Sequence, residues 1–146
     1  MDIVTTVPVP VKAPDTIAPL LEAVRDRVAC RAFENYVRRG CVDGHDVDDW
    51  LDAERELIIK PIPIIRTDRD DIFVKMVLPE IDLPNLAVHI APCQLVIASD
   101  PDEDGLQLCQ VIDLPCEISL DGVDAEQLQN MLNIAAAITH PQPQLD

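Results

Sequence analysis

The hydrophobic pattern of this chain changes its period near residue 65, and that change constrains the fold more than any other feature. Between Ile17 and Val37, apolar side chains recur every three or four residues, which is the spacing of one face of an α-helix. After Ile65 they recur every second residue, as in a strand with one buried face. We therefore expect a chain that is helical first and all-β afterwards.

The alternation is clearest in four stretches, residues 72–78, 86–90, 95–97 and 106–114. Proline-containing or acidic breakers separate them, the longest being the turn Asp100–Gly105. Short strands with turns at this spacing favour an antiparallel sandwich over a parallel sheet. The predicted fold class is α+β, with an N-terminal helical hairpin followed by an all-β, immunoglobulin-like sandwich.

The helical part is expected to be a hairpin of two helices. The first should end at Gly40, which can adopt the left-handed conformation of a C′ residue. The second should begin at Asp46, with Asp49 in the position of a capping-box acid. Each helix is expected to carry an apolar stripe, and the stripe of the second can pack against the first helix. The stripes are Ile17, Leu20, Leu21, Val24 and Val28, continued by Ala29, Ala32, Phe33, Tyr36 and Val37, in the first helix, and Val47, Trp50, Leu51, Leu57 and Ile58 in the second.

Prolines mark the predicted boundaries. Val7-Pro8-Val9-Pro10 and Pro14 predict an extended or disordered arm, because proline lacks an amide donor and disfavours helix in the residue before it. The expected organisation is an arm over 1–14, the hairpin over 15–59, a Pro-containing linker or first strand over 60–66, the sandwich over 67–139 and a disordered tail over 140–146.

Charge and composition exclude several classes of function. The formal net charge is −16, with 11 basic against 27 acidic residues, which disfavours nucleic acid and anionic membranes as partners. No apolar run approaches the roughly 20 residues of a membrane span, and the N-terminus lacks the features of a signal peptide, so a cytoplasmic protein is expected. The five cysteines form no C-x-x-C pair and are expected to be free thiols.

One acidic run could be mistaken for a metal or catalytic site. Asp43, His45, Asp46, Asp48 and Asp49 lack the spacing of an EF-hand loop, and acids are favourable at the start of a helix. His89 is expected on the polar face of a strand and His140 in the tail. We therefore expect no catalytic residue, metal site or cofactor, and hence no enzyme.

Two family resemblances follow from longer motifs. Residues 28–57, with Asp49-Trp50-Leu51 and Ala53-Glu54-Arg55-Glu56-Leu57, resemble a small bacterial helical domain of unknown function. Residues 62–138 resemble the alpha-crystallin domain of small heat-shock proteins. The similar segments are Leu78-Pro79, QLVIAS, VIDLPCEISLDGVDAE and the run from Ala125 to Ile134, in that order.

The second resemblance implies an ATP-independent holdase that binds unfolded or partner proteins. It also implies a protein-binding groove with Val88 and Ile90 on one wall and Ile118 and Leu120 on the other. Ile62-Pro63-Ile64 has the form of an anchor for such a groove, because proline keeps the backbone extended with both isoleucines on one side. The same three residues could instead be the first strand or the linker.

The chain departs from the family pattern in ways that bear on assembly. Asn130 stands at the signature glycine, where asparagine tolerates a left-handed backbone. The turn at Asp100–Gly105 is too short for an exchanged loop strand, and the tail has no Ile-x-Ile anchor. We expect a monomer or dimer instead of a large shell. The alternative function is a monomeric adaptor whose helical hairpin binds a specific partner.

Overall fold

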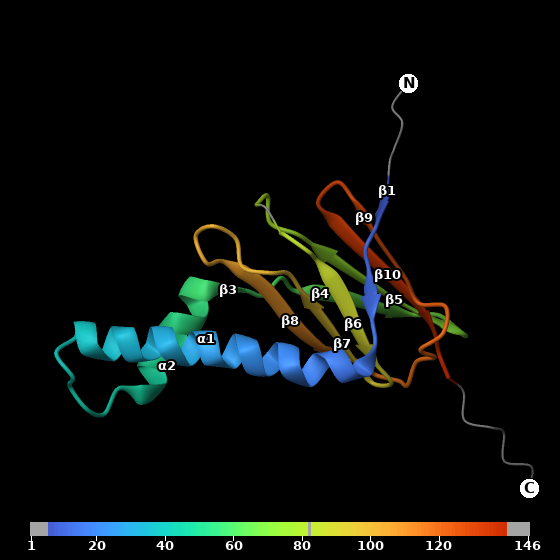
Figure 1. Cartoon of the computed structure of the whole chain (residues 1–146). Coiled ribbons are helices and arrows are strands. Elements are labelled where there is room, and N and C mark those ends of the chain that lie inside the picture. Colours follow the sequence, from blue (N-terminus) through green and yellow to red (C-terminus); the bar gives the residue numbers. More distant parts are fainter. Residues whose placement is uncertain (1–5, 82, 140–146) are drawn as a thin grey trace, which may run out of the picture.

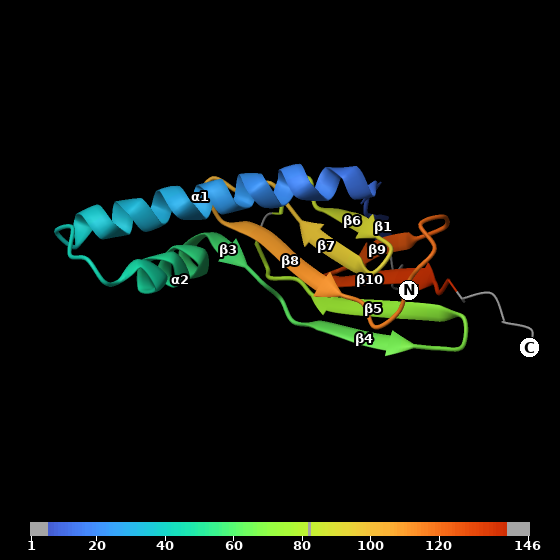
Figure 2. The same cartoon turned by 90° about the horizontal axis from the view of Figure 1, so that it is seen from below.

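The molecule is built in three layers. The computed structural model describes residues 6–81 and 83–139. A helical hairpin lies on one sheet, and a second sheet lies on the far side of the first (Figures 1 and 2). After the short strands β1 and β2, the two helices precede the main strands, which confirms the α+β fold class expected from the change of hydrophobic period.

Two five-stranded sheets form the sandwich. The first has the order β1-β9-β10-β5-β4 and the second the order β2-β6-β7-β8-β3. Neighbouring strands are antiparallel, except that β2 runs parallel to β6 and β3 parallel to β8. The strands are β1 (Thr6–Pro8), β2 (Val11–Lys12), β3 (Ile58–Ile59), β4 (Pro63–Thr67), β5 (Asp71–Val77), β6 (Ala87–Ala91), β7 (Gln94–Ala98), β8 (Gln107–Asp113), β9 (Asp124–Leu128) and β10 (Met131–Ala137).

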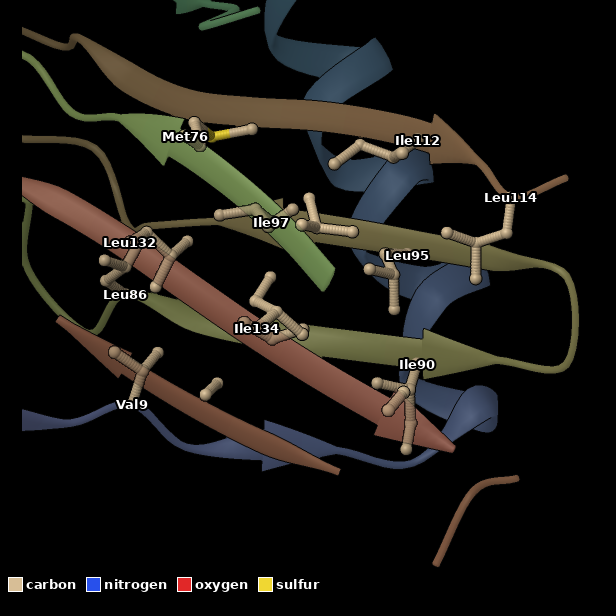
Figure 3. Packing of buried hydrophobic residues seen from close by; sticks show 14 of the residues in the cluster. Val9, Met76, Leu86, Ile90, Leu95, Ile97, Ile112, Leu114, Leu132 and Ile134 are labelled. Carbon is tan, nitrogen blue, oxygen red and sulfur yellow. The ribbon is translucent and has the colours of Figure 1, made fainter. Parts of the chain in front are cut away.

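The alternating residues of the sequence fill the space between the sheets. On β5, Ile72, Val74 and Met76 are each 1% exposed, and the residues between them are not buried. Figure 3 shows side chains from both sheets meeting there, among them Leu132 and Ile134 of β10. Burying each such side chain contributes about 1.5–3 kcal/mol, so the interior of the sandwich is the main source of its stability.

The hairpin consists of α1 (Ile17–Arg38), preceded by the short 3-10 helix η1 (Pro14–Thr16), and α2 (Asp46–Leu57). The predicted end of α1 is confirmed, because Gly40 adopts a left-handed backbone with φ 84°. The amide of Cys41 then donates to the carbonyl of Tyr36 at 3.0 Å, which satisfies one of the free carbonyls at the helix end.

The hairpin is packed firmly on the outer face of the β6-β7-β8 sheet. A second apolar cluster joins Ile17 and Val28 of α1 and Leu57 of α2 to the outward-facing Val96 and Cys109. Arg27 extends this contact by donating to the carbonyl of Gly105 at 2.6 Å and to the side chain of Gln107. The helices and the sandwich therefore share an apolar interface.

The apolar stripes predicted for the hairpin were partly wrong. Phe33, Val47 and Leu51 are 65%, 70% and 45% exposed. The buried residues of α2 are Asp49, Ala53 and the predicted Leu57. Trp50 and Ile58 of the predicted stripe also pack in the second apolar cluster.

Asp49 does not cap the helix as predicted. It is a buried residue of α2, and its carboxylate lies 2.5 Å from the guanidinium of Arg39. The N-cap is His45, whose carbonyl accepts the amide of Asp49 at 2.9 Å, and Asp46 is the first helical residue. The ion pair with the end of α1 therefore takes the side chain that the capping box would have used.

The left-handed residue of the β9–β10 turn is Gln129, with φ 55°, and not Asn130 as predicted. The carbonyl of Asn130 accepts the amide of Leu78 at 2.6 Å, which links this turn to the end of β5.

Candidate functional site

The candidate site, which we call the groove, is the line between β6 and β9 along which residues 6–12 pair with both sheets. Residues 6–12, which we call the strap, lie along this line (Figure 1). Its first half, β1, pairs with β9, and its second half, β2, pairs with β6. The strap therefore adds one strand to each sheet and closes the groove between them.

A single side chain anchors the strap. Val9, between β1 and β2, is 7% exposed and belongs to the sandwich core (Figure 3). Val7 and Val11 on either side are 56% and 36% exposed. The amide of Val9 donates to the carbonyl of Ala125 at 2.9 Å. The strap is thus held by main-chain hydrogen bonds and one apolar side chain buried in the core, which is the chemistry of strand addition.

The Val-Pro-Val-Pro-Val sequence suits this position. Pro8 and Pro10 hold the backbone extended and cannot donate to a neighbouring strand, so the segment can end a sheet but cannot continue it. The carbonyl of Pro10 remains available and accepts the amide of Val88 at 2.9 Å. From the sequence we expected these residues to form part of an extended or disordered arm. The alternation of three valines was the signal that could have identified a strand.

The four residues predicted as groove walls are not all presented to a partner. Val88, Ile90 and Ile118 are between 0% and 4% exposed and belong to the sandwich core, whereas Leu120 is 38% exposed. Val88 does lie at the groove, because it pairs with Val11 of the strap. Ile118 forms a bridge with Ile138. Contact of these four side chains with another protein stays a prediction.

The possible anchor residues Ile62 and Ile64 lie away from the groove. Ile64 is in β4, at the opposite edge of its sheet from β1, and pairs with Lys75 of β5. Ile62 and Ile64 are 84% and 64% exposed, so neither is docked within its own chain. Their docking in a groove stays a prediction. The sequence allowed a strand or a linker here, and Pro63 and Ile64 form the start of the strand β4.

His89 lies under the start of α1 and is half-buried. Its Nδ1 is 2.7 Å from the hydroxyl of Thr16. Burial, followed by the positive charge of Lys12 on the strap, lowers the pKa of this imidazole from its ordinary value of 6.5. The prediction of a surface histidine on a polar strand face was therefore wrong in part, since α1 and the strap cover that face.

The acidic run at the start of α2 does not converge on one point. Asp43 accepts the hydroxyl of Tyr36 at 3.2 Å, which raises the pKa of that phenol. Asp49 is paired with Arg39, and His45 adjoins only Asp48, at 3.4 Å. Within residues 6–81 and 83–139, no group of three or more His, Cys, Asp or Glu side chains is placed to hold a metal ion. His140 and the tail lie outside the described residues.

A small hollow of about 190 Å³ lies where the hairpin meets β8, lined by residues that include Val24, Trp50 and Cys109. Burial raises the pKa of the Cys109 thiol, with Lys60 and Glu54 acting in opposite directions. A buried thiol with a raised pKa is a poor nucleophile. The thiol of Cys109 is therefore not activated as a nucleophile.

Two of the solved structures similar to this chain are small heat-shock proteins. Heat shock protein 16.0 from Schizosaccharomyces pombe matches with a TM-score of 0.50 and 14% identity, over 74% of this chain and 94% of that one. A mutant of hsp14.1 from Sulfolobus solfatataricus P2 matches with a TM-score of 0.52 and 15% identity, over 78% and 97%. The sandwich has the small heat-shock protein fold. This alpha-crystallin-like architecture is the one that the motifs between residues 62 and 138 predicted.

Sequence comparison identifies the hairpin separately. Residues 24–58 match the family described as a protein of unknown function (DUF2934). This match covers most of α1 and all of α2, and agrees with the helical domain expected from residues 28–57. No curated protein sequence matches the chain. Neither helix in the described part is long and apolar enough to cross a membrane.

Proposed function

We propose that this protein is a non-catalytic, ATP-independent holdase that binds extended apolar segments of unfolded or partner proteins in the cytoplasm. The observation that carries the proposal is the strap. The groove between β6 and β9 already holds an extended Val-Pro-Val-Pro-Val segment by strand addition, with the side chain of Val9 buried in the core. A client segment with a small β-branched side chain every second residue has the same shape and chemistry.

Binding of a client at this groove requires release of the strap. Val9 is its only buried side chain, so the contribution of the strap to stability is on the order of the burial of one valine, about 1.5–3 kcal/mol. A cover held this weakly opens locally without unfolding of the sandwich. The net charge of −16 then keeps a complex with an apolar client in solution through mutual repulsion.

The test is aggregation of thermally unfolded malate dehydrogenase, followed by light scattering with and without the protein. We expect the intact protein to reduce scattering, and Val9→Asp to reduce it further because the buried anchor is lost and the groove opens. Val7→Asp is the matched control, since Val7 lies on the same strap with its side chain in solvent. Scattering that none of the three proteins reduces, although each is folded by circular dichroism, contradicts the proposal.

A second candidate function is supported by the hairpin, as an adaptor that binds a specific partner. Phe33, Val37, Val47 and Leu51 are at least 45% exposed, and three of the chain's four aromatic residues lie on the hairpin. The double variant Phe33→Ser, Val47→Ser distinguishes the two functions. An adaptor loses its partner in this variant, whereas a holdase acting through the groove protects malate dehydrogenase as well as the intact chain does.

A further inference from the structure

The chain covers the edges of its two sheets unequally. At the groove, β1 and β2 cover β9 and β6, and they are three and two residues long with Pro8 and Pro10 at their ends. On β8, the two-residue strand β3 covers the first residues, and the side chain of Gln110 is bonded to the carbonyl of Pro61. Short or proline-containing strands at edges prevent further pairing. The remaining edge strand, β4, has no such cover among the described residues.

β4 has the hydrogen-bonding groups that a further strand needs. The amide of Asp68 donates to the carbonyl of Asp71 at 2.8 Å and closes the β4–β5 hairpin. Hydrogen-bonding direction alternates along an antiparallel strand, so Ile64 and Arg66 face β5 while Ile65 and Thr67 direct their N–H and C=O groups outward. Pro63 directs its carbonyl outward and has no N–H.

The side chains along this edge are apolar and accessible. Ile62, Ile64 and Ile65 are 84%, 64% and 37% exposed, and Val77 at the end of β5 is 53% exposed. Arg66 lies over the ring of Phe73 at 5.7 Å from its centre, so its charged group is held on the outer face of the sheet. Long apolar side chains on an uncovered edge strand indicate a pairing site.

The charge of this edge differs from that of the other strands of the sandwich. Residues 60–78 hold four basic side chains (Lys60, Arg66, Arg69, Lys75) and three acidic ones (Asp68, Asp70, Asp71), whereas residues 79–139 hold acidic side chains and no Lys or Arg. Two copies therefore repel each other less when they approach through β4 than when they approach through the rest of the sandwich.

We propose that β4 pairs with β4 of a second copy, antiparallel about a two-fold axis at Ile65. In this register Ile65 exchanges hydrogen bonds with Ile65 of the second copy, and the Thr67 amide donates to the Pro63 carbonyl of that copy. Because Pro63 has no amide, only the reciprocal hydrogen bond from Pro63 to the carbonyl of Thr67 does not form. Ile64 then lies beside Arg66 of the second copy, where the alkyl stem of the arginine covers it. The two copies form one continuous sheet, and both grooves stay accessible.

The test is the mass of the intact chain in solution, measured by light scattering after size exclusion over a range of concentrations. We expect a mass twice the 16.2 kDa of one chain, decreasing on dilution. Ile64→Lys places a lysine beside Arg66 of the second copy and should weaken association at least about tenfold. Adding Arg66→Glu to the same chain should restore the dimer, because each new lysine then meets a carboxylate. Val47→Lys, on the exposed face of α2, is the matched control and should leave the dimer unchanged.

A second variant tests the hydrogen bonds without a change of charge. Thr67→Pro removes the outward amide of an exposed residue, leaves the β4–β5 ladder intact and should also weaken the dimer. The proposal is overturned if the intact chain is a monomer at every concentration, or if Ile64→Lys and Thr67→Pro both remain dimeric. No client protein enters this measurement, so its outcome is separate from that of the aggregation test.

Discussion

The two sides of the sandwich solve the problem of exposed strand edges in different ways. At the groove side, the seven-residue strap covers both sheets with two prolines and one buried valine. At the β4 side, a five-residue strand carries exposed isoleucines and outward-directed amides. At the groove side, the strap occupies the binding site and must be released before a client can bind. At the β4 side, a second strand can pair with β4 without any rearrangement of the chain.

The largest expected effect concerns the interior that both sides share. Leu132 on β10 is fully buried between the sheets, and Leu132→Ala should lower the free energy of unfolding by about 2–5 kcal/mol through the cavity it leaves. Ile64→Ala at the uncovered edge should change it by no more than about 0.5 kcal/mol in the monomer. Urea denaturation at low protein concentration measures both. A large loss from Ile64→Ala would show that β4 is already part of the core.

An intermediate effect is expected at the strap. Val9→Asp should weaken docking of the strap by about 1.5–3 kcal/mol, because a carboxylate cannot replace the buried side chain of the valine. The amides of Val9 and Val88, which donate across the strap, should then exchange hydrogen faster, while amides of the β4–β5 ladder keep their protection. Val7→Asp is the control. Equal loss of protection in both regions would mean that the strap is integral to the sandwich and is not a removable cover.

The smallest effect is a dependence on pH that arises from His89 at the groove side. The pKa of His89 is lowered in the folded state, so the folded protein binds this proton more weakly than the unfolded chain. The contribution of neutral His89 to the free energy of unfolding is present above pH 6.5 and is lost as the pH falls through the lowered pKa of the folded state. Between about pH 7.5 and 5.5 we expect the urea midpoint to decrease. His89→Gln should reduce the decrease, and His45→Gln, which changes an exposed imidazole, should not.

The strands of the sandwich could be predicted where one face is buried along the whole strand. Ile72, Val74 and Met76 alternate with polar or exposed residues, and this pattern survives in any antiparallel packing. The end of α1 at Gly40 was predictable for a similar reason, because the conformation required there is local. Such features depend on neighbours within a few residues of the chain.

The candidate site could not be predicted in the same way. Val7, Val9 and Val11 alternate over too few residues to identify a strand, and their partners β9 and β6 are distant in the sequence. The stripes of the hairpin were misassigned in part, because Ala53 and the Arg39–Asp49 pair also lie between the helices, whereas Phe33, Val47 and Leu51 are exposed. The choice between two neighbouring faces of a helix depends on what the other elements offer.

The sequence by itself determined the order of the helices and the main strands, the buried face of those strands and the acidic character of the chain, because period and charge are properties of the chain alone. Only the tertiary structure decided which edges are covered. The strap closes one side and leaves β4 open on the other, and this follows from contacts between residues more than seventy positions apart, such as Val11 with Val88. Local pattern contains no information about such pairs, so the sites for binding and assembly became visible only once the two sheets were in place.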